Sequence, residues 1–137
     1  MTSTVVYQGD LRTTCTHLKS GNFFDTDAPV DNNGKGERFS PTDLLATSLG
    51  TCMLTTMGIR ARKMGFDLNG TEVEVEKIMK PDPRRVGGIN VFCHIPDNLK
   101  SIDQTTKVIL KKIGETCPVM LSINPDIKVK IDWGAWE

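Results

Sequence analysis

The chain has 137 residues, with 17 basic and 17 acidic side chains, and its formal net charge is zero. This balance offers no electrostatic basis for binding nucleic acid or an anionic membrane, so we expect neither as a partner. The length suits a single domain over residues 1–137. A domain of this size buries roughly two-thirds of its unfolded surface and needs no disulfide bonds to fold.

The N-terminal part of the chain predicts three short strands followed by a loop. The strand patterns are rich in β-branched and aromatic residues, are separated by Gly and Asn turns, and cover residues 4–7, 11–18 and 23–26. Residues 28–37 are rich in Gly and Asn and are typical of a loop. Loops of that length in compact domains often carry function.

A long helix is predicted to begin at Pro41. Ser40 can cap the free amides, Pro41 suits the first helical position, and Asp43 favours the positive end of the helix dipole. Gly65 is the expected stop. Residues 44–59 carry no charge at all. A helix without a charged face must be buried, and a chain of this size can hardly enclose it alone, so we expect a dimer.

The C-terminal half predicts three more strands and a second helix. The strands are expected at residues 71–78, 89–95 and 126–133, and the helix runs from a cap at Ser101 to Thr116, where Pro118 forces a break. The order βββ-α-ββ-α-β predicts the α+β class, with an antiparallel sheet on one side and helices on the other.

The opening residues lack the basic region and the long apolar run of a secretion signal. The most apolar stretch, residues 44–59, is interrupted by Thr and Ser, which makes it a poor membrane span. We therefore expect a cytoplasmic protein, in which cysteines are reduced by default and a disulfide is more often catalytic than structural.

Two of the four cysteines lie in unusual settings. Cys52 is in the middle of the uncharged helix, and Cys117 follows 65 residues later, directly before Pro118. With Pro118 at the first helical position, Cys117 would be the N-cap residue, where free amides favour a thiolate. A thiolate attacks a peroxide, becomes a sulfenic acid, and is trapped by a second thiol as a disulfide. Cys52 as the attacking thiol and Cys117 as the resolving thiol fit this scheme, whereas the simpler interpretation is two ordinary buried cysteines.

Cys52 lies too deep in its helix for the N-terminal dipole to activate it. A reactive Cys52 therefore needs a cation from elsewhere in the fold. Arg12, beside the first turn, is our first candidate. Arg38, just before the helix cap, is the second, and the adjacent pair Arg84 and Arg85 is weaker.

Cys15 and Cys93 are expected to be packing residues of strands. His17 and His94 stand close to them in sequence, but there is no Cys-x-x-Cys, and alternate strand positions do not form a tetrahedral ligand set. We therefore predict no metal site and no cofactor.

The segment Ser40–Ala46 leads into Ser48-Leu49-Gly50-Thr51-Cys52, and Cys117-Pro118-Val119 stands at a helix break. Together these features resemble the OsmC/Ohr family of osmotically inducible and organic-hydroperoxide-resistance proteins, more its general OsmC-like branch than Ohr proper. The resemblance implies antiparallel sheets wrapped around a long buried central helix in an intertwined homodimer, with two active sites at the subunit interface. It also implies organic hydroperoxides as substrates and a dithiol, such as a lipoyl group, as reductant.

The resemblance further implies roles for individual residues. Cys52 would be peroxidatic, Cys117 resolving, and Arg12 the arginine of the N-terminal hairpin that pairs with the thiolate. Family members commonly carry Glu directly after the helix-starting Pro to orient that arginine, but Thr42 holds this place here. Asp43 or Glu37 could substitute.

The leading hypothesis is a thiol-dependent peroxidase that reduces organic hydroperoxides, and hydrogen peroxide less well. Leu49, Met53 and Met57 would supply an apolar lining. The missing Glu after Pro41 motivates an alternative: a non-catalytic dimeric module that binds a small apolar ligand or senses oxidation. A third option is acyl or thioester chemistry at Cys52.

Overall fold

The structure is a computed structural model that describes all residues, 1–137. The chain packs as two compact units, Met1–Leu45 and Ala46–Glu137, and each is described by itself. No helix combines the length and the apolar character that crossing a membrane requires.

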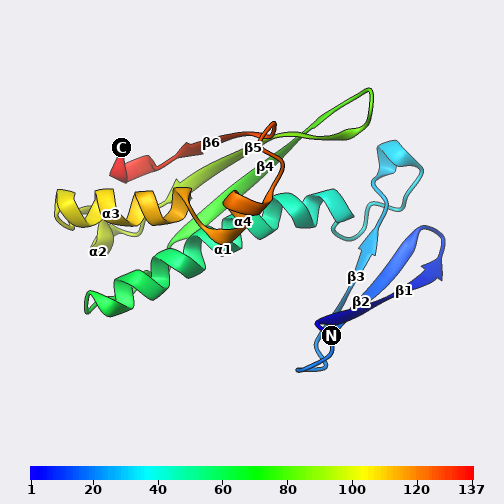
Figure 1. Ribbon diagram of the computed structural model, residues 1–137, viewed down its shortest axis with the longest axis horizontal. Helices are drawn as coiled ribbons and strands as arrows, with labels where there is room; N and C mark the ends of the chain where they lie inside the picture. Colours follow the sequence, from blue (N-terminus) through cyan, green and yellow to red (C-terminus); the bar gives the residue numbers. More distant parts are fainter. The chain divides into compact units, whose positions relative to one another are not determined.

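The first unit is built on a three-stranded antiparallel sheet in the order β1-β2-β3 (Figure 1). The strands are β1 (Ser3–Gly9), β2 (Arg12–His17) and β3 (Phe23–Asp27), which confirms all three predicted strands. The predicted loop after β3 contains one short 3-10 helix, η1 (Val30–Asn32).

Helix α1 (Pro41–Lys63) begins and ends at the predicted signals. At its start the Ser40 Oγ accepts the amide of Asp43 at 3.0 Å, and the Asp43 carboxylate accepts the amide of Ser40 at 2.9 Å. This reciprocal pair is a capping box. At its end Gly65 has a φ of +89°, its amide donates to the Arg62 carbonyl at 3.1 Å, and the Phe66 amide donates to the Ala61 carbonyl at 3.1 Å. These two bonds form a Schellman motif.

Only one side of α1 is buried within the chain. The buried residues follow one stripe: Ala46, Leu49, Gly50, Met53, Met57 and Ala61. On the opposite side Thr51 and Thr55 are exposed, and Ile59 is 54% exposed. The sheet and the other helices of the second unit cover one face of α1 only, which agrees with the expectation that a single chain can hardly enclose this helix.

The second unit holds a mixed sheet rather than the predicted antiparallel one. Its strands are β4 (Glu72–Lys80), β5 (Arg85–His94) and β6 (Lys128–Asp132). β4 and β5 are antiparallel, whereas β5 and β6 are parallel. A parallel pair needs a long crossover connection, and the helical segment between these two strands supplies it. β5 also begins four residues earlier than predicted, at Arg85 instead of Ile89.

The crossover consists of three helices, whereas the sequence predicts one helix, a break and a short helical turn that begins at Pro118. They are α2 (Asp97–Lys100), α3 (Gln104–Glu115) and α4 (Pro118–Ser122). The predicted cap at Ser101 is wrong, because Asp103 caps α3 instead. Its carboxylate accepts the amide of Thr106 at 2.9 Å and the hydroxyl of Thr106 at 2.6 Å.

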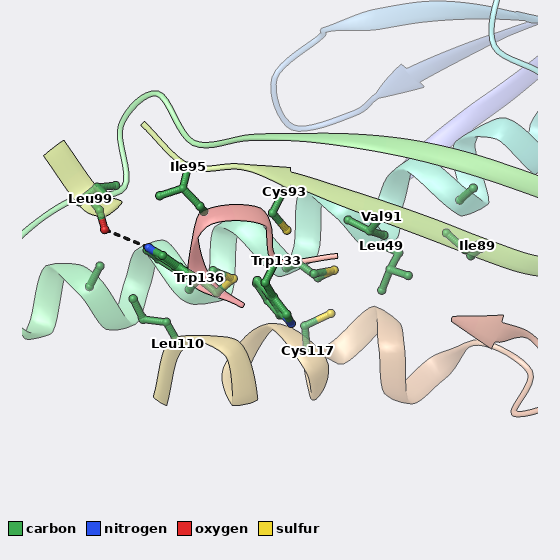
Figure 2. Close-up of a cluster of buried hydrophobic side chains, with 14 of the residues drawn as sticks. Leu49, Ile89, Val91, Cys93, Ile95, Leu99, Leu110, Cys117, Trp133 and Trp136 are labelled. Carbon is green, nitrogen blue, oxygen red and sulfur yellow. Dashed lines mark hydrogen bonds between the residues drawn. The ribbon is translucent and has the colours of Figure 1, made fainter. Parts of the chain in front are cut away.

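The core of the second unit lies between one face of its sheet and the helices α1 and α3 (Figure 1). β5 contributes Ile89, Val91 and Cys93, which alternate with outward-facing residues. Trp133 and Trp136 are both buried, and the indole N–H of Trp136 donates to the carbonyl of Leu99 at 2.9 Å (Figure 2).

Candidate thiol site

Cys117 lies at the junction between α3 and α4. It is the N-cap residue of α4 with Pro118 at the first helical position, as the sequence predicts. Its side chain points into the core and is 1% exposed (Figure 2). Gly114, three residues earlier, lets the end of α3 pack closely on the core, because a Cβ there would lie 2.9 Å from the sulfur of Met57 and 3.0 Å from the ring of Trp133.

Cys52 lies on α1 at the edge of the buried stripe, where it is partly buried and packs against the core cluster. It lies close enough to Cys117 to raise the pKa of the Cys117 thiol. Both cysteines are free. The fold therefore brings together the two sulfurs on which the sequence argument for dithiol chemistry depends.

Several influences act on the Cys117 thiol, and together they raise its pKa. Burial raises the pKa most. The backbone amides of Met120 and Val119 lower it, although neither completes a capping hydrogen bond to the sulfur. The amides lower the pKa of Cys117 as the N-cap position predicts, but burial raises it more. The expectation that this position favours a thiolate is therefore wrong.

The nearby Cys52 side chain also raises the pKa of Cys117, in part through its negative charge when ionised. This effect favours the protonated form of Cys117. A state in which both thiols are ionised at once is therefore disfavoured.

The surroundings of the pair within the second unit carry little charge. The stretch of α1 around Cys52, residues 44–59, has no charged side chain. The hydroxyl of Thr56 donates to the Cys52 carbonyl at 2.9 Å. Val119 and Met120 of α4 are half-buried beside Cys117.

The apolar lining expected from the sequence is not available at the surface. Leu49, Met53 and Met57 are each at most 1% exposed. They pack inside the core and present no surface to a dissolved peroxide. Their expected role as lining residues is therefore wrong for the single chain.

Arg12 belongs to the first unit and is held there by two carboxylates. Its Nε and Nη2 donate to the two carboxylate oxygens of Asp27 at 2.8 and 2.9 Å. Nη2 also donates to Glu37 at 3.2 Å. Asp27 is 1% exposed, and the hydrogen bonds from Arg12 lower the pKa of its carboxyl group. Glu37, which the sequence offers as a partner for Arg12, does contact it.

Sequence reasoning missed Asp27. The signal was its place at the end of β3, directly opposite Arg12 in the β2–β3 pairing. Its burial becomes evident only in the folded sheet. The other two supporting candidates have local contacts: Asp43 takes part in the capping box of α1, and Arg38 donates to the Glu37 carbonyl at 3.0 Å.

The other two cysteines are strand residues, as expected. Cys15 is half-buried on β2, and Cys93 is buried on β5. Burial raises the pKa of Cys93 to about 11, which keeps this thiol protonated at neutral pH. The histidines bind polar neighbours, His17 with Ser20 at 2.7 Å and His94 with Glu74 at 2.8 Å.

Comparison with known proteins agrees with this architecture. The family described as OsmC-like protein matches residues 34–132. The chain therefore belongs to the OsmC-like protein family. No match is found among curated protein sequences.

Among solved structures, a protein from Psychrobacter arcticus 273-4 is 53% identical to this chain, with a TM-score of 0.91. The match covers 96% of this chain and 94% of that chain. The Psychrobacter protein is provisionally described as an osmotic stress induced and detoxification response protein.

Two more distant structures share the fold alone. An organic hydroperoxide resistance protein OsmC from Legionella pneumophila is 18% identical over 96% of each chain, with a TM-score of 0.72. The organic hydroperoxide resistance protein OhrB of Bacillus subtilis is 17% identical over 96% of this chain and 97% of its own, with a TM-score of 0.65.

Proposed function

We propose that this protein is a thiol-dependent peroxidase that reduces organic hydroperoxides through Cys52 and Cys117. The observation that carries the proposal is the proximity of these two thiols, of which Cys117 is buried at a helix start. Membership of the OsmC-like family supports it, as do the Legionella and Bacillus structures with the same fold, both of which are named organic hydroperoxide resistance proteins.

The reaction proceeds in two steps. The Cys52 thiolate attacks the terminal oxygen of ROOH, so that the O–O bond breaks, Cys52 becomes a sulfenic acid, and the alcohol leaves. Cys117 then attacks the Cys52 sulfur and expels water, and the pair ends as an intramolecular disulfide. A dithiol reductant, of which a lipoyl group is one example, returns two electrons and restores both thiols.

Arg12 is proposed as the cation that stabilises the Cys52 thiolate. A guanidinium held on two sides by Asp27 and Glu37 is fixed in orientation and stays charged, and each of these features suits a thiolate partner. We also propose that the protein acts as a homodimer, because the uncovered side of α1 bears no charge from residue 44 to 59.

The test is turnover of cumene hydroperoxide with dihydrolipoamide as reductant. Wild-type protein is expected to consume the hydroperoxide and, without reductant, to form a Cys52–Cys117 disulfide that peptide mass mapping detects. Cys52→Ser is expected to lose activity entirely. Cys93→Ala, which alters a buried thiol outside the pair, is the matched control and should retain it. A Cys52→Ser protein that consumes hydroperoxide as fast as wild type rules the proposal out.

A second candidate is the non-catalytic module that binds a small apolar ligand or senses oxidation. One observation favours it: two carboxylates already pair with Arg12, so part of its charge is compensated before any thiolate is bound. A protein that forms the disulfide once but shows no turnover with any dithiol would support this candidate.

A further inference from the structure

The two carboxylates that hold Arg12 differ in burial and in the way they bind it. Asp27 is 1% exposed and binds side-on, with one carboxylate oxygen on Nε at 2.8 Å and the other on Nη2 at 2.9 Å. Glu37 is 61% exposed and accepts a single bond from Nη2 at 3.2 Å. A two-point contact fixes the orientation of a planar guanidinium, whereas one exposed contact does not. Asp27 therefore sets the direction of Arg12.

Asp27 is itself held firmly by the first unit. It stands opposite Arg12 in the pairing of β2 with β3, so both side chains leave the sheet on the same face. Its backbone amide donates to the carbonyl of Phe39 at 3.1 Å, and its Oδ2 accepts the backbone amide of Glu37 at 3.2 Å. The carboxylate that orients Arg12 is thus tied both to the sheet and to the segment just before α1.

The same hydrogen bonds decide which nitrogen of Arg12 is free. They use the one hydrogen of Nε and both hydrogens of Nη2. Nη1 makes no hydrogen bond within the chain and keeps two N–H groups for another acceptor. The Arg12 side chain is 23% exposed, so the first unit does not seal it off.

We propose that Asp27 is the positioning residue of the thiol site, because it holds Arg12 so that Nη1 is the nitrogen offered to the Cys52 thiolate. This assignment rests on the part of the proposed function in which Arg12 stabilises that thiolate. Thr42, directly after the helix-starting Pro41, has no carboxylate with which to take this role. Glu37 has a different role, that of a compensating charge at the exposed side of the guanidinium.

Asp27 has two opposite effects on a thiolate bound at Arg12. As an anion it cancels part of the guanidinium charge, so its removal alone would increase the thiolate fraction of Cys52. As the anchor of the guanidinium it keeps Nη1 in place, so its removal would let Arg12 turn away and would decrease that fraction. We expect orientation to dominate, because a donor that turns away loses the contact entirely, whereas compensation only weakens it. The sign of the change therefore tests the assignment.

The experiment follows alkylation of Cys52 by iodoacetamide across pH, with peptide mass spectrometry to separate Cys52 from the other cysteines. Only the thiolate reacts, so the rate at pH 7 reports the thiolate fraction. Turnover of cumene hydroperoxide is measured in parallel. The variants are Asp27→Asn and Glu37→Gln, with Asp25→Asn as the matched control. Asp25 lies two residues earlier on β3, and its carboxylate accepts the hydroxyl of Thr14 at 2.7 Å instead of a guanidinium.

We expect Asp27→Asn to alkylate Cys52 about tenfold more slowly at pH 7, with the pH profile displaced to higher pH, and to lose about 10- to 100-fold in turnover. Glu37→Gln should alkylate at least as fast as wild type, because it removes a compensating charge and leaves the two-point contact in place. Asp25→Asn should match wild type. An Asp27→Asn protein that alkylates as fast as wild type, or faster, would overturn the assignment.

A double mutant separates positioning from folding. If Asp27 acts through Arg12, Asp27→Asn slows alkylation in wild type but causes no further loss in Arg12→Ala. Stability should show the reverse pattern. Arg12→Ala leaves the buried Asp27 charge without its main partner, so adding Asp27→Asn should raise the midpoint of urea denaturation. A further loss of alkylation in the double mutant would contradict a role through Arg12.

Arg12→Lys tests the same geometry without leaving a buried charge unpaired, and it decides the question if Asp27→Asn does not fold. Lysine keeps the positive charge but is a point charge that cannot make the side-on contact with Asp27. It should therefore also slow the alkylation of Cys52 about tenfold. An Arg12→Lys protein with the wild-type rate would show that charge alone is sufficient, and the positioning role would be excluded.

The two proposals fail in different ways. If Asp27→Asn slows alkylation but wild type does not consume cumene hydroperoxide, the peroxidase proposal fails and the positioning role stands. If wild type consumes the hydroperoxide and Asp27→Asn changes neither alkylation nor turnover, only the positioning role fails. If Arg12→Ala alkylates like wild type, Arg12 does not act on Cys52, and its proposed role fails together with that of Asp27.

Discussion

Gly50 decides how closely α1 approaches the sheet that supports the thiol site. A Cβ at this position would lie 2.9 Å from a methyl group of Val75 and 3.0 Å from one of Val73. Both contacts are with β-branched side chains, which are stiff and cannot turn aside easily. The small residue therefore lets the helix pack against β4, and this packing holds Cys52 at the depth where it meets Cys117.

We predict that Gly50→Ala destabilises the protein by about 1 kcal/mol or more. Overpacking a core typically costs about 1–3 kcal/mol, and the gain in helix propensity offsets up to about 1 kcal/mol of that. Gly58→Ala is the matched control on the same helix, because a Cβ there meets nothing within 4 Å of the chain. Urea denaturation measures both, and a Gly50→Ala protein as stable as wild type would contradict the packing argument.

At the scale of elements, the connection between α3 and α4 positions the resolving thiol. α3 starts at the Asp103 cap and ends at Glu115, and Cys117 follows as the first cap of α4. The hydrogen bonds from Thr106 lower the pKa of Asp103. A carboxyl group with a lowered folded-state pKa stabilises the fold above its unfolded pKa of about 3.9, and this contribution is lost as the pH falls through the folded-state value.

We predict that Asp103→Asn weakens the pH dependence of stability in acid. Asparagine still caps a helix, so the variant should be close to wild type at pH 7, but it has no carboxyl group to protonate. The midpoint of urea denaturation between about pH 5 and pH 2 should therefore fall less steeply in the variant. Glu115→Gln, at the other end of α3, is the control. An unchanged slope in Asp103→Asn would show that the cap does not contribute to acid sensitivity.

At the scale of the whole molecule, the exposed side of α1 is uncharged and partly apolar. It carries no charge between residues 44 and 59, and Ile59 is 54% exposed. A hollow of about 460 Å³ runs beside it, lined by α1, by residues 70–73 and by Val75. A second copy of the chain would cover this surface, consistent with the proposed homodimer.

The single domain over residues 1–137 stays a prediction.

We predict a particle of twice the 15.1 kDa chain mass in light scattering, and a shift toward monomer in Thr55→Lys. Thr55 is exposed, and lysine is a better helix former than threonine, so the change should weaken association without destabilising the chain. Thr116→Lys is a close control: Thr116 is also exposed, and like Thr55 its hydroxyl donates to the carbonyl four residues earlier at 2.8 Å. A Thr55→Lys protein that remains fully dimeric would exclude this side of α1 as the interface.

Local signals in the sequence were sufficient for much of the fold and part of the site. The Ser40–Asp43 cap, the Gly65 stop and the N-cap position of Cys117 each depend on a few neighbouring residues, and all three agree with the structure. The wrong cap at Ser101 belongs to the same class of signal, since Ser and Asp are both good caps and only the bonds to Thr106 select between them.

The tertiary structure alone decided the rest. Three features join residues far apart along the chain: the parallel pairing of β5 with β6, the ion pair of Arg12 with the buried Asp27, and the proximity of Cys52 to Cys117. The raised pKa of Cys117 also depends on the tertiary structure. The amides that lower this pKa are local, whereas the burial that raises it depends on everything packed around the sulfur. Capping and periodicity act over a few residues, but proximity and desolvation are properties of the packed core and have no local signature in the sequence.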